Sequence, residues 1–197
     1  FECSRPTRRG LVYGQWDPAV HVSPERAAYR PGSAVILGAD WGWESPTVVL
    51  LIQTDGEQVW VFDELVLQHT QFEDILQQLE MKLEAYGASC GQAFVDRSRP
   101  EYCDALRKRF KIRVNQFDKT KGAETHDADG RVLTRWGSIK QGLDEVRRML
   151  KSAGGTVRLR VHPRCAFTIA EFDLYHNQPK PGLFDSAGVQ MYGDAPE

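Results

Sequence analysis

The chain has 197 residues and a mass of 22.3 kDa, which suits one domain or one domain with an arm. With 41% hydrophobic and 10% aromatic residues it can build a hydrophobic core, which excludes a wholly disordered chain. The net charge of −2 excludes a general polycation, so binding to nucleic acid would need a local basic patch. No apolar run is long enough to span a membrane, and the opening residues FECSRPTRRG lack the apolar core of a signal peptide. The four cysteines are scattered without a CxxC pair, which favours a reduced, cytosolic chain and argues against a zinc site.

The first 33 residues are polar and interrupted by proline and glycine, so we expect an arm or linker over residues 1–33 and a domain over 34–197. A short strand is possible at LVYGQW (11–16). The apolar run SAVILGAD (33–40) then predicts a buried central strand. Residues 46–65 predict two strands joined at Asp55-Gly56, a strong hairpin signal.

Helices and strands alternate through the rest of the chain. The segment Thr70-Gln71-Phe72-Glu73 has the pattern of a capping box, and apolar residues continue at helical spacing to a stop at Gly87. The remaining expectations are strands at 92–96, 112–117 and 156–161, helices at 98–110, 138–151 and 163–175, a loop or hairpin at 118–137, and a last helix near 185–193. This order predicts an α/β fold with a mixed central β-sheet flanked by helices.

Three aspartates occupy positions typical of functional residues in such sheets. Asp40 and Asp96 each end a predicted core strand, and Asp185 begins the predicted last helix. Carboxylates gathered at one edge would suit Mg²⁺ or Mn²⁺, and two such ions can clamp a phosphodiester. For any one of them, a turn-forming or helix-capping role is the competing interpretation.

Five segments, in order along nearly the whole chain, resemble the nuclease (C-terminal) domain of tailed-bacteriophage terminase large subunits. The first is RGLVYGQWDPAVHV, which resembles the link between the ATPase and nuclease domains, followed by GADWGWESPTVVLLIQTDGEQVWVFDEL, which resembles the first acidic motif. AFVDRSRPEYCDALRKRFKIRV resembles the second acidic motif, KTKG with WGSIKQGLDEVRRML the lysine stretch after it, and IAEFDLYHNQ with FDSAGVQMYG the terminal acidic segment.

The resemblance implies an RNase H-like fold and an endonuclease that cleaves double-stranded, concatemeric phage DNA by two-metal-ion hydrolysis during packaging. By motif match the Mg²⁺ or Mn²⁺ ligands and catalytic acids would be Asp40, Asp96 and Asp185, although Ser186, Val189 and Gln190 depart from the family's last motif. The implied partners are DNA, an ATPase domain of the same full-length chain, the portal and the small terminase subunit, with no membrane. The implied location is the host cell cytoplasm, at the procapsid. No phosphate-binding GxxxxGK[ST] motif is present, so the ATP-driven motor is not in this chain.

Other residues carry smaller predictions. Glu64 (or Asp63) ends the third strand and is a candidate additional acid. Lys119 and Lys121, and the basic run containing Arg107, Lys108 and Arg109, are candidate DNA contacts because phosphates bind such groups without sequence preference. Each has a solvated surface role as its alternative.

Two other functions remain open from the sequence alone. A Holliday-junction resolvase or transposase can share an RNase H-like sheet, because a fold does not fix a function. A non-catalytic DNA-clamping or docking module would keep the architecture without binding metal.

Overall fold

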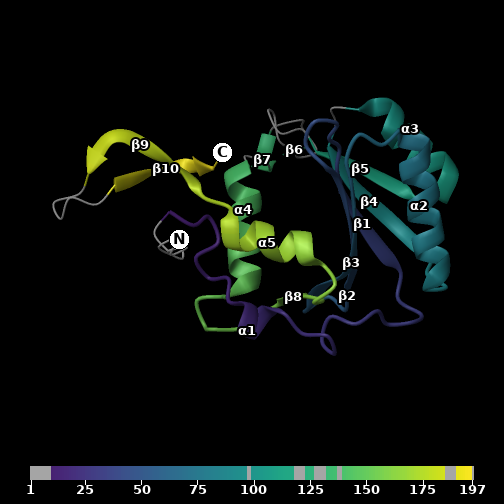
Figure 1. Cartoon of the computed structure of the whole chain (residues 1–197), viewed down its shortest axis with the longest axis horizontal. Helices are drawn as coiled ribbons and strands as arrows, with labels where there is room; N and C mark the ends of the chain where they lie inside the picture. Colours follow the sequence, from purple (N-terminus) through teal and green to yellow (C-terminus); the bar gives the residue numbers. More distant parts are fainter. Residues whose placement is uncertain are drawn as a thin grey trace, which may run out of the picture.

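The computed structural model describes residues 10–96, 99–117, 123–126, 132–136, 139–184 and 190–196, with side chains described over 10–96, 99–117 and 141–177. A six-stranded sheet of order β5-β4-β1-β2-β3-β8 forms its centre (Figure 1). The strands are β1 (Val35–Asp40), β2 (Thr47–Thr54), β3 (Val59–Leu67), β4 (Cys90–Asp96), β5 (Arg113–Phe117) and β8 (Leu159–Val161).

Helices cover both faces of this sheet. Helices α2 (Phe72–Ala85) and α3 (Pro100–Phe110) lie on one face, and α4 (Ile139–Leu150) and α5 (Ala166–Leu174) lie on the other (Figure 1). The remaining described elements are the short α1 (Pro18–His21) and two hairpins, β6 (Ala123–His126) with β7 (Val132–Trp136) and β9 (Asn177–Phe184) with β10 (Gln190–Pro196). No helix in the described part of the chain is both long and apolar enough to cross a bilayer.

Strand direction follows the order of the elements. The hairpin turn at Asp55-Gly56 makes β2 and β3 antiparallel, and β1 is also antiparallel to β2. Each of α2 and α3 leads into a strand parallel to the existing sheet, so β4 pairs parallel with β1 and β5 pairs parallel with β4. The predicted mixed α/β sheet is confirmed, and the carboxyl ends of β1, β4 and β5 meet at one edge.

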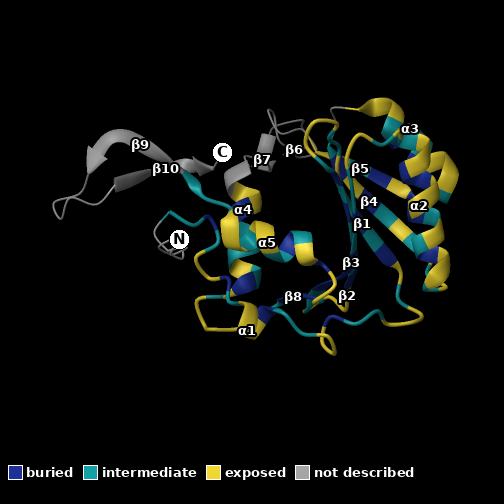
Figure 2. Cartoon of the chain, viewed as in Figure 1, coloured by how far each residue is buried: buried dark blue, intermediate teal, exposed yellow. Residues whose placement is uncertain are grey.

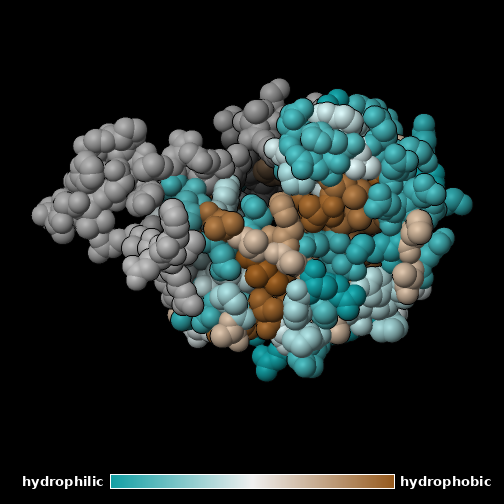
Figure 3. Space-filling model, viewed as in Figure 1, coloured by the Kyte–Doolittle hydropathy of each residue, from teal (hydrophilic) through white to brown (hydrophobic). Residues whose placement is uncertain are grey.

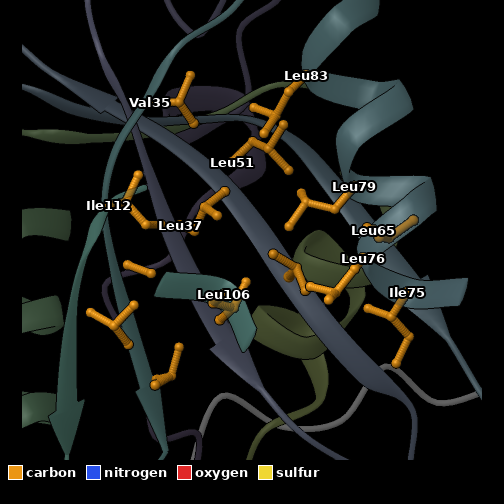
Figure 4. Close-up of a cluster of buried hydrophobic side chains, with 14 of the residues drawn as sticks. Val35, Leu37, Leu51, Leu65, Ile75, Leu76, Leu79, Leu83, Leu106 and Ile112 are labelled. Carbon is orange, nitrogen blue, oxygen red and sulfur yellow. The ribbon is translucent and has the colours of Figure 1, made fainter. Parts of the chain in front are cut away.

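Successive side chains of a strand point to opposite faces of the sheet, and each face has its own hydrophobic cluster. Val35 and Leu37 of β1 point toward α2 and α3, where they pack with Leu51, Leu79 and Leu106 (Figure 4). The opposite face contributes a smaller cluster that includes Val61, Leu150 and Val161. Figure 2 shows the buried residues concentrated on the sheet and on the inner sides of the helices.

The segment before β1 packs on the domain. Four of its residues are buried: Val12, Trp16, His21 and Ala27. The Trp16 ring stacks on Phe172 of α5 with ring centroids 4.4 Å apart. His21 Nε2 lies 2.9 Å from the Leu150 carbonyl oxygen. The possible strand over 11–16 is not formed, since Leu11 makes only an isolated bridge to His176. Residues 10–33 are therefore an ordered part of the same hydrophobic structure.

Two local expectations are corrected, and a third lies outside the described residues. The predicted helix near 185–193 is wrong over its second half, because residues 190–196 form β10, paired with β9. Helix α2 begins after Gln71 without a side-chain cap, and Thr70 Oγ1 donates to the Gln68 carbonyl, so no capping box forms. The predicted helix start at Ser98 lies outside the described residues, and α3 itself begins at Pro100.

Candidate metal centre

Asp40 and Asp96 lie side by side at the carboxyl ends of β1 and β4. The parallel register pairs Ala39 with Val95, so the next residues on the two strands are the two aspartates. Neighbouring strands are about 4.8 Å apart, and residues at one level of a ladder point to the same face. Asp40 is exposed and Asp96 half-buried. The two aspartates therefore lie next to each other at the same edge of the sheet.

The turn after Asp40 is held by aromatic packing and by a buried threonine. Trp41 makes edge contacts with Phe72 of α2 and Tyr102 of α3, with ring centroids 5.5 and 5.6 Å away. Thr47 Oγ1 accepts a hydrogen bond from Gly42 N at 3.1 Å and donates to Gly42 O at 2.8 Å. These contacts connect the end of β1 to the start of β2 and to the two helices behind the sheet, so the backbone that carries Asp40 is held in place.

Glu64, the candidate additional acid, lies on the same face of the sheet as Asp40, but its carboxylate accepts hydrogen bonds from the start of α5. One carboxylate oxygen accepts from Phe167 N at 2.8 Å, and the other accepts from Thr168 N at 2.9 Å and Thr168 Oγ1 at 2.6 Å. An acid at a helix N-terminus satisfies amide groups that have no partner in the helix and suits the helix dipole. In this arrangement Glu64 fixes the start of α5.

Asp63, the alternative to Glu64, points to the opposite face. Its carboxylate accepts from Lys82 Nζ at 2.9 Å and from Tyr86 Oη at 2.7 Å, both on the α2 side of the sheet. Burial acts to raise the pKa of Asp63, but the hydrogen bonds from Tyr86 and Lys82 outweigh it and hold this pKa below its ordinary value. Asp63 is thus a structural carboxylate, separated from Asp40 by the sheet.

An apolar pocket of about 240 Å³ adjoins the acidic edge, between β2 and α5. Its wall includes Val48, which pairs directly with Asp40, and Glu171 of α5. Figure 3 shows hydrophobic residues reaching the surface on this side of the molecule. Sequence reasoning did not single out Glu171. Glu171 follows Phe167 by four residues and Thr168 by three, so the three side chains lie on one face of α5, and all three line the pocket.

The other predicted site residues are not brought to Asp40 and Asp96 by the described structure. Asp185, Lys119 and Lys121 lie outside the described residues. The basic run with Arg107, Lys108 and Arg109 is the last turn of α3, on the opposite face. Arg107 pairs with Asp104 at 2.6 Å, and Arg109 pairs with Glu73 and Glu80 of α2 at 2.8 and 2.7 Å.

The chemistry of the donor set fits a hard divalent cation. Two adjacent carboxylates supply only oxygen, the ligand type that Mg²⁺ and Mn²⁺ prefer. Within the described residues no group of three or more His, Cys, Asp or Glu side chains is arranged to hold a metal. A divalent cation held by Asp40 and Asp96 would need further ligands.

No protein-family model matches the sequence, and the comparison with curated proteins finds no match. The nuclease domain of the P22 large terminase matches the structure with a TM-score of 0.58 and 16% identity, over 94% of this chain and 86% of that chain. The chain has the RNase H-like fold of a large-terminase nuclease domain.

Two further terminase structures extend this comparison. The large terminase of a thermophilic bacteriophage, in complex with ADP, matches with a TM-score of 0.64 and 17% identity, over 94% of this chain and 41% of that chain. The nuclease domain of the bacteriophage SPP1 large terminase, with bound Mn, matches with a TM-score of 0.50 and 16% identity, over 88% of this chain and 83% of that chain. The chain thus spans about two fifths of the ADP-bound large terminase and most of the isolated nuclease domains.

Proposed function

We propose that this chain is the metal-dependent endonuclease domain of a DNA-packaging terminase and cleaves double-stranded, concatemeric phage DNA. The observation that carries the proposal is the placement of Asp40 and Asp96 at one level on adjacent parallel strands. The terminase nuclease fold supports it, as does the Mn bound to the SPP1 nuclease domain.

The chain's own residues would bind and orient the reacting groups. Asp40, whose strand lies between β2 and β4 in the sheet, would hold the two metal ions together with Asp96 and Asp185. Two bound Mg²⁺ or Mn²⁺ ions would supply activation of water and stabilisation of the leaving oxygen. The packing of Trp41 on α2 and α3 holds the backbone next to Asp40 in place, which would limit reorganisation during cleavage.

Replacing each acid by its amide tests the proposal. We expect Asp40→Asn and Asp96→Asn to lose Mn²⁺-dependent plasmid cleavage, because a neutral amide binds a hard cation poorly. Asp185→Asn should lose at least about tenfold, the lower end of losses at metal sites. Melting temperature in EDTA should stay equal or rise, since carboxylate repulsion is relieved.

Asp74→Asn on the exposed surface of α2 is the matched control and should cleave as the unchanged chain does. Wild-type cleavage by Asp40→Asn would refute the assignment. Full activity of Asp185→Asn alone would leave Asp40 and Asp96 in place and direct the search for a third acid to Glu171, Glu64 and Asp194.

The proposed partners follow from the same function. They are duplex DNA, an ATPase domain in the full-length chain, the portal and the small terminase subunit, at the procapsid in the host cytoplasm. Residues 10–33 are then the link to the ATPase domain, packed against the nuclease domain by Trp16 and His21.

A further inference from the structure

A second, polar pocket of about 290 Å³ is lined by three arginines from two different parts of the chain. Arg26 and Arg30 come from the segment before β1, and Arg160 comes from β8. Gln58 and Trp60, at the start of β3, form another wall. Among the described residues that line this pocket there is no acidic side chain.

The pocket lies at the end of the sheet away from the candidate metal centre. Trp60 pairs with Gln53 of β2, whereas Asp40 pairs with Val48 of the same strand. Five residues of β2 separate these two levels, a distance of about 17 Å along an extended strand. The arginine pocket is therefore a separate feature, and its role does not depend on the nuclease proposal.

Arg160 is a buried cation whose hydrogen bonds are incomplete. The residue is only 9% exposed, and its one hydrogen bond within the described structure runs from Nη1 to the Leu159 carbonyl at 3.1 Å. Its Nε and the Nε1 of Trp60 are both buried without an acceptor among the described residues. Burial, with a smaller effect of the nearby Arg26 charge, lowers the pKa of the Arg160 guanidinium. A buried charge in this state is costly unless an anion compensates it.

Arg30 is held at the pocket by its backbone and by its ring contact. The buried Gln53 accepts from Arg30 N at 2.9 Å and donates to Arg30 O at 3.0 Å. The Arg30 guanidinium lies 3.9 Å from the centroid of the Trp60 ring and 3.6 Å from one carboxylate oxygen of Asp55. Arg26 has no ion pair with any described residue. Of the three arginines, only Arg30 has an ion pair with a described carboxylate.

We propose that Arg26, Arg30 and Arg160 form an anion site for a phosphate group. Guanidinium groups donate pairs of hydrogen bonds that match phosphate oxygens, and donors from separate segments can surround a tetrahedral anion better than a planar carboxylate. The pocket is larger than a lone phosphate requires, so the group can enter attached to a nucleotide or to a DNA strand. Both sources share this chemistry, and they are distinguished by experiment.

The test measures binding of inorganic phosphate to the 197-residue chain by calorimetry and by melting temperature, in chloride buffer of matched ionic strength. Phosphate should raise the melting temperature of the unchanged chain. Arg160→Met, which keeps most of the side-chain volume, and the exposed Arg26→Gln should each weaken phosphate binding at least about tenfold, the effect of losing one charge-assisted hydrogen bond. Without phosphate, Arg160→Met should melt at the same or a higher temperature, since an uncompensated buried charge is removed.

Arg158→Gln is the matched control, because Arg158 is two residues from Arg160 but donates to the Glu57 carbonyl at 2.8 Å and does not line the pocket. Its phosphate affinity should be unchanged. Affinity for a short duplex, measured in EDTA, identifies the source: loss in Arg160→Met indicates DNA phosphate, and no loss indicates a free phosphate or nucleotide. Phosphate binding equal in all four proteins, or stabilisation by polyglutamate but not by phosphate, would overturn the proposal.

Discussion

Glu64 shows how one carboxylate can be structural at the border of a functional site. Its two oxygens accept three hydrogen bonds from the first turn of α5, the helix that carries Glu171 and one wall of the apolar pocket. The prediction that Glu64 ends its strand is wrong, because β3 continues to Leu67, and the local sequence does not reveal these hydrogen bonds. The hydrogen-bond partners are 103 and 104 residues away, and nothing in the local pattern encodes them.

Glu64→Gln should therefore reduce stability even without metal. The amide keeps one acceptor oxygen and presents an N–H₂ group to backbone donors, so we expect a loss of about 1–3 kcal/mol in the free energy of unfolding. Urea denaturation in EDTA measures it. Glu145→Gln, which removes an exposed carboxylate on α4, should change stability by less than about 0.5 kcal/mol. Equal stability of Glu64→Gln and the unchanged chain would show that α5 does not depend on this carboxylate.

Asp63 predicts a pH dependence of stability. Hydrogen bonds from Tyr86 and Lys82 keep its folded pKa below the ordinary value, so the folded state favours the carboxylate. The resulting stabilisation is full above the unfolded pKa and is lost as pH falls through the lower, folded pKa. We expect Asp63→Asn to be less stable by about 1–3 kcal/mol at pH 7, with the difference shrinking below about pH 4. Urea titrations across this range measure the difference.

Asp74→Asn serves again as the control, since the Asp74 side chain is exposed on α2. Because Asp74 lies in the first turn of α2, its loss should change the free energy of unfolding by less than about 1 kcal/mol, and this change should be smaller than that in Asp63→Asn at pH 7. A difference between Asp63→Asn and the unchanged chain that stays constant from pH 7 to about pH 3 would contradict the assignment of the pH dependence to this carboxylate.

At the scale of elements, the β1–β2 turn is the connection most closely tied to the candidate metal centre. A Cβ at Gly42 would lie 2.2 Å from the Ser45 carbonyl oxygen and 2.8 Å from that of Pro46. Both are backbone atoms, so the turn that follows Asp40 must move to admit an alanine. The close approach, and not an unusual backbone angle, is what requires glycine here.

Gly42→Ala should lower both stability and Mn²⁺ affinity. We expect a loss of about 1–3 kcal/mol in unfolding free energy, the usual cost of overpacking, and weaker Mn²⁺ binding by calorimetry. Gly142→Ala supplies a control of opposite sign, because a Cβ there meets nothing within 4 Å on α4 and should stabilise by about 0.5–1 kcal/mol. Unchanged Mn²⁺ affinity in Gly42→Ala would show that the turn does not position Asp40.

Elements with a long periodic pattern of apolar residues and a clear stop signal could be predicted from the sequence. The final segment could not. Helix α2 has apolar residues at helical spacing and ends where Gly87 takes a φ of 57°, as its sequence indicates. By contrast, FDSAGVQMYG is short, and its few apolar residues fit a helix or a strand equally well. Pairing of β10 with β9 decides between them, and that contact is tertiary.

Across the whole molecule the net charge is only −2, but acidic and basic groups gather in different places. Asp40 and Asp96 lie at one end of the sheet's strands, and the arginine pocket lies toward the opposite end. The basic last turn of α3 is on the far face, where Arg109 already pairs with α2. The predicted DNA contacts Lys119 and Lys121 lie outside the described residues, but in the sequence they closely follow Phe117, the residue that pairs with Asp96.

Two charge reversals of equal size test which basic residues meet DNA. We expect Lys119→Glu with Lys121→Glu to weaken duplex binding at least about tenfold at low salt and to reduce the salt dependence by about two released counterions, because the loop leaves β5 beside Asp96. Arg107→Glu with Lys108→Glu makes the same change in net charge and leaves Arg109 bound to Glu73 and Glu80. Its loss should be smaller, since a duplex at the acidic edge must pass around β5 to reach it. Affinity measured in EDTA over a series of salt concentrations separates the two. Equal losses would place DNA on both faces of the sheet, and no loss in the lysine pair would remove Lys119 and Lys121 from the DNA-binding surface.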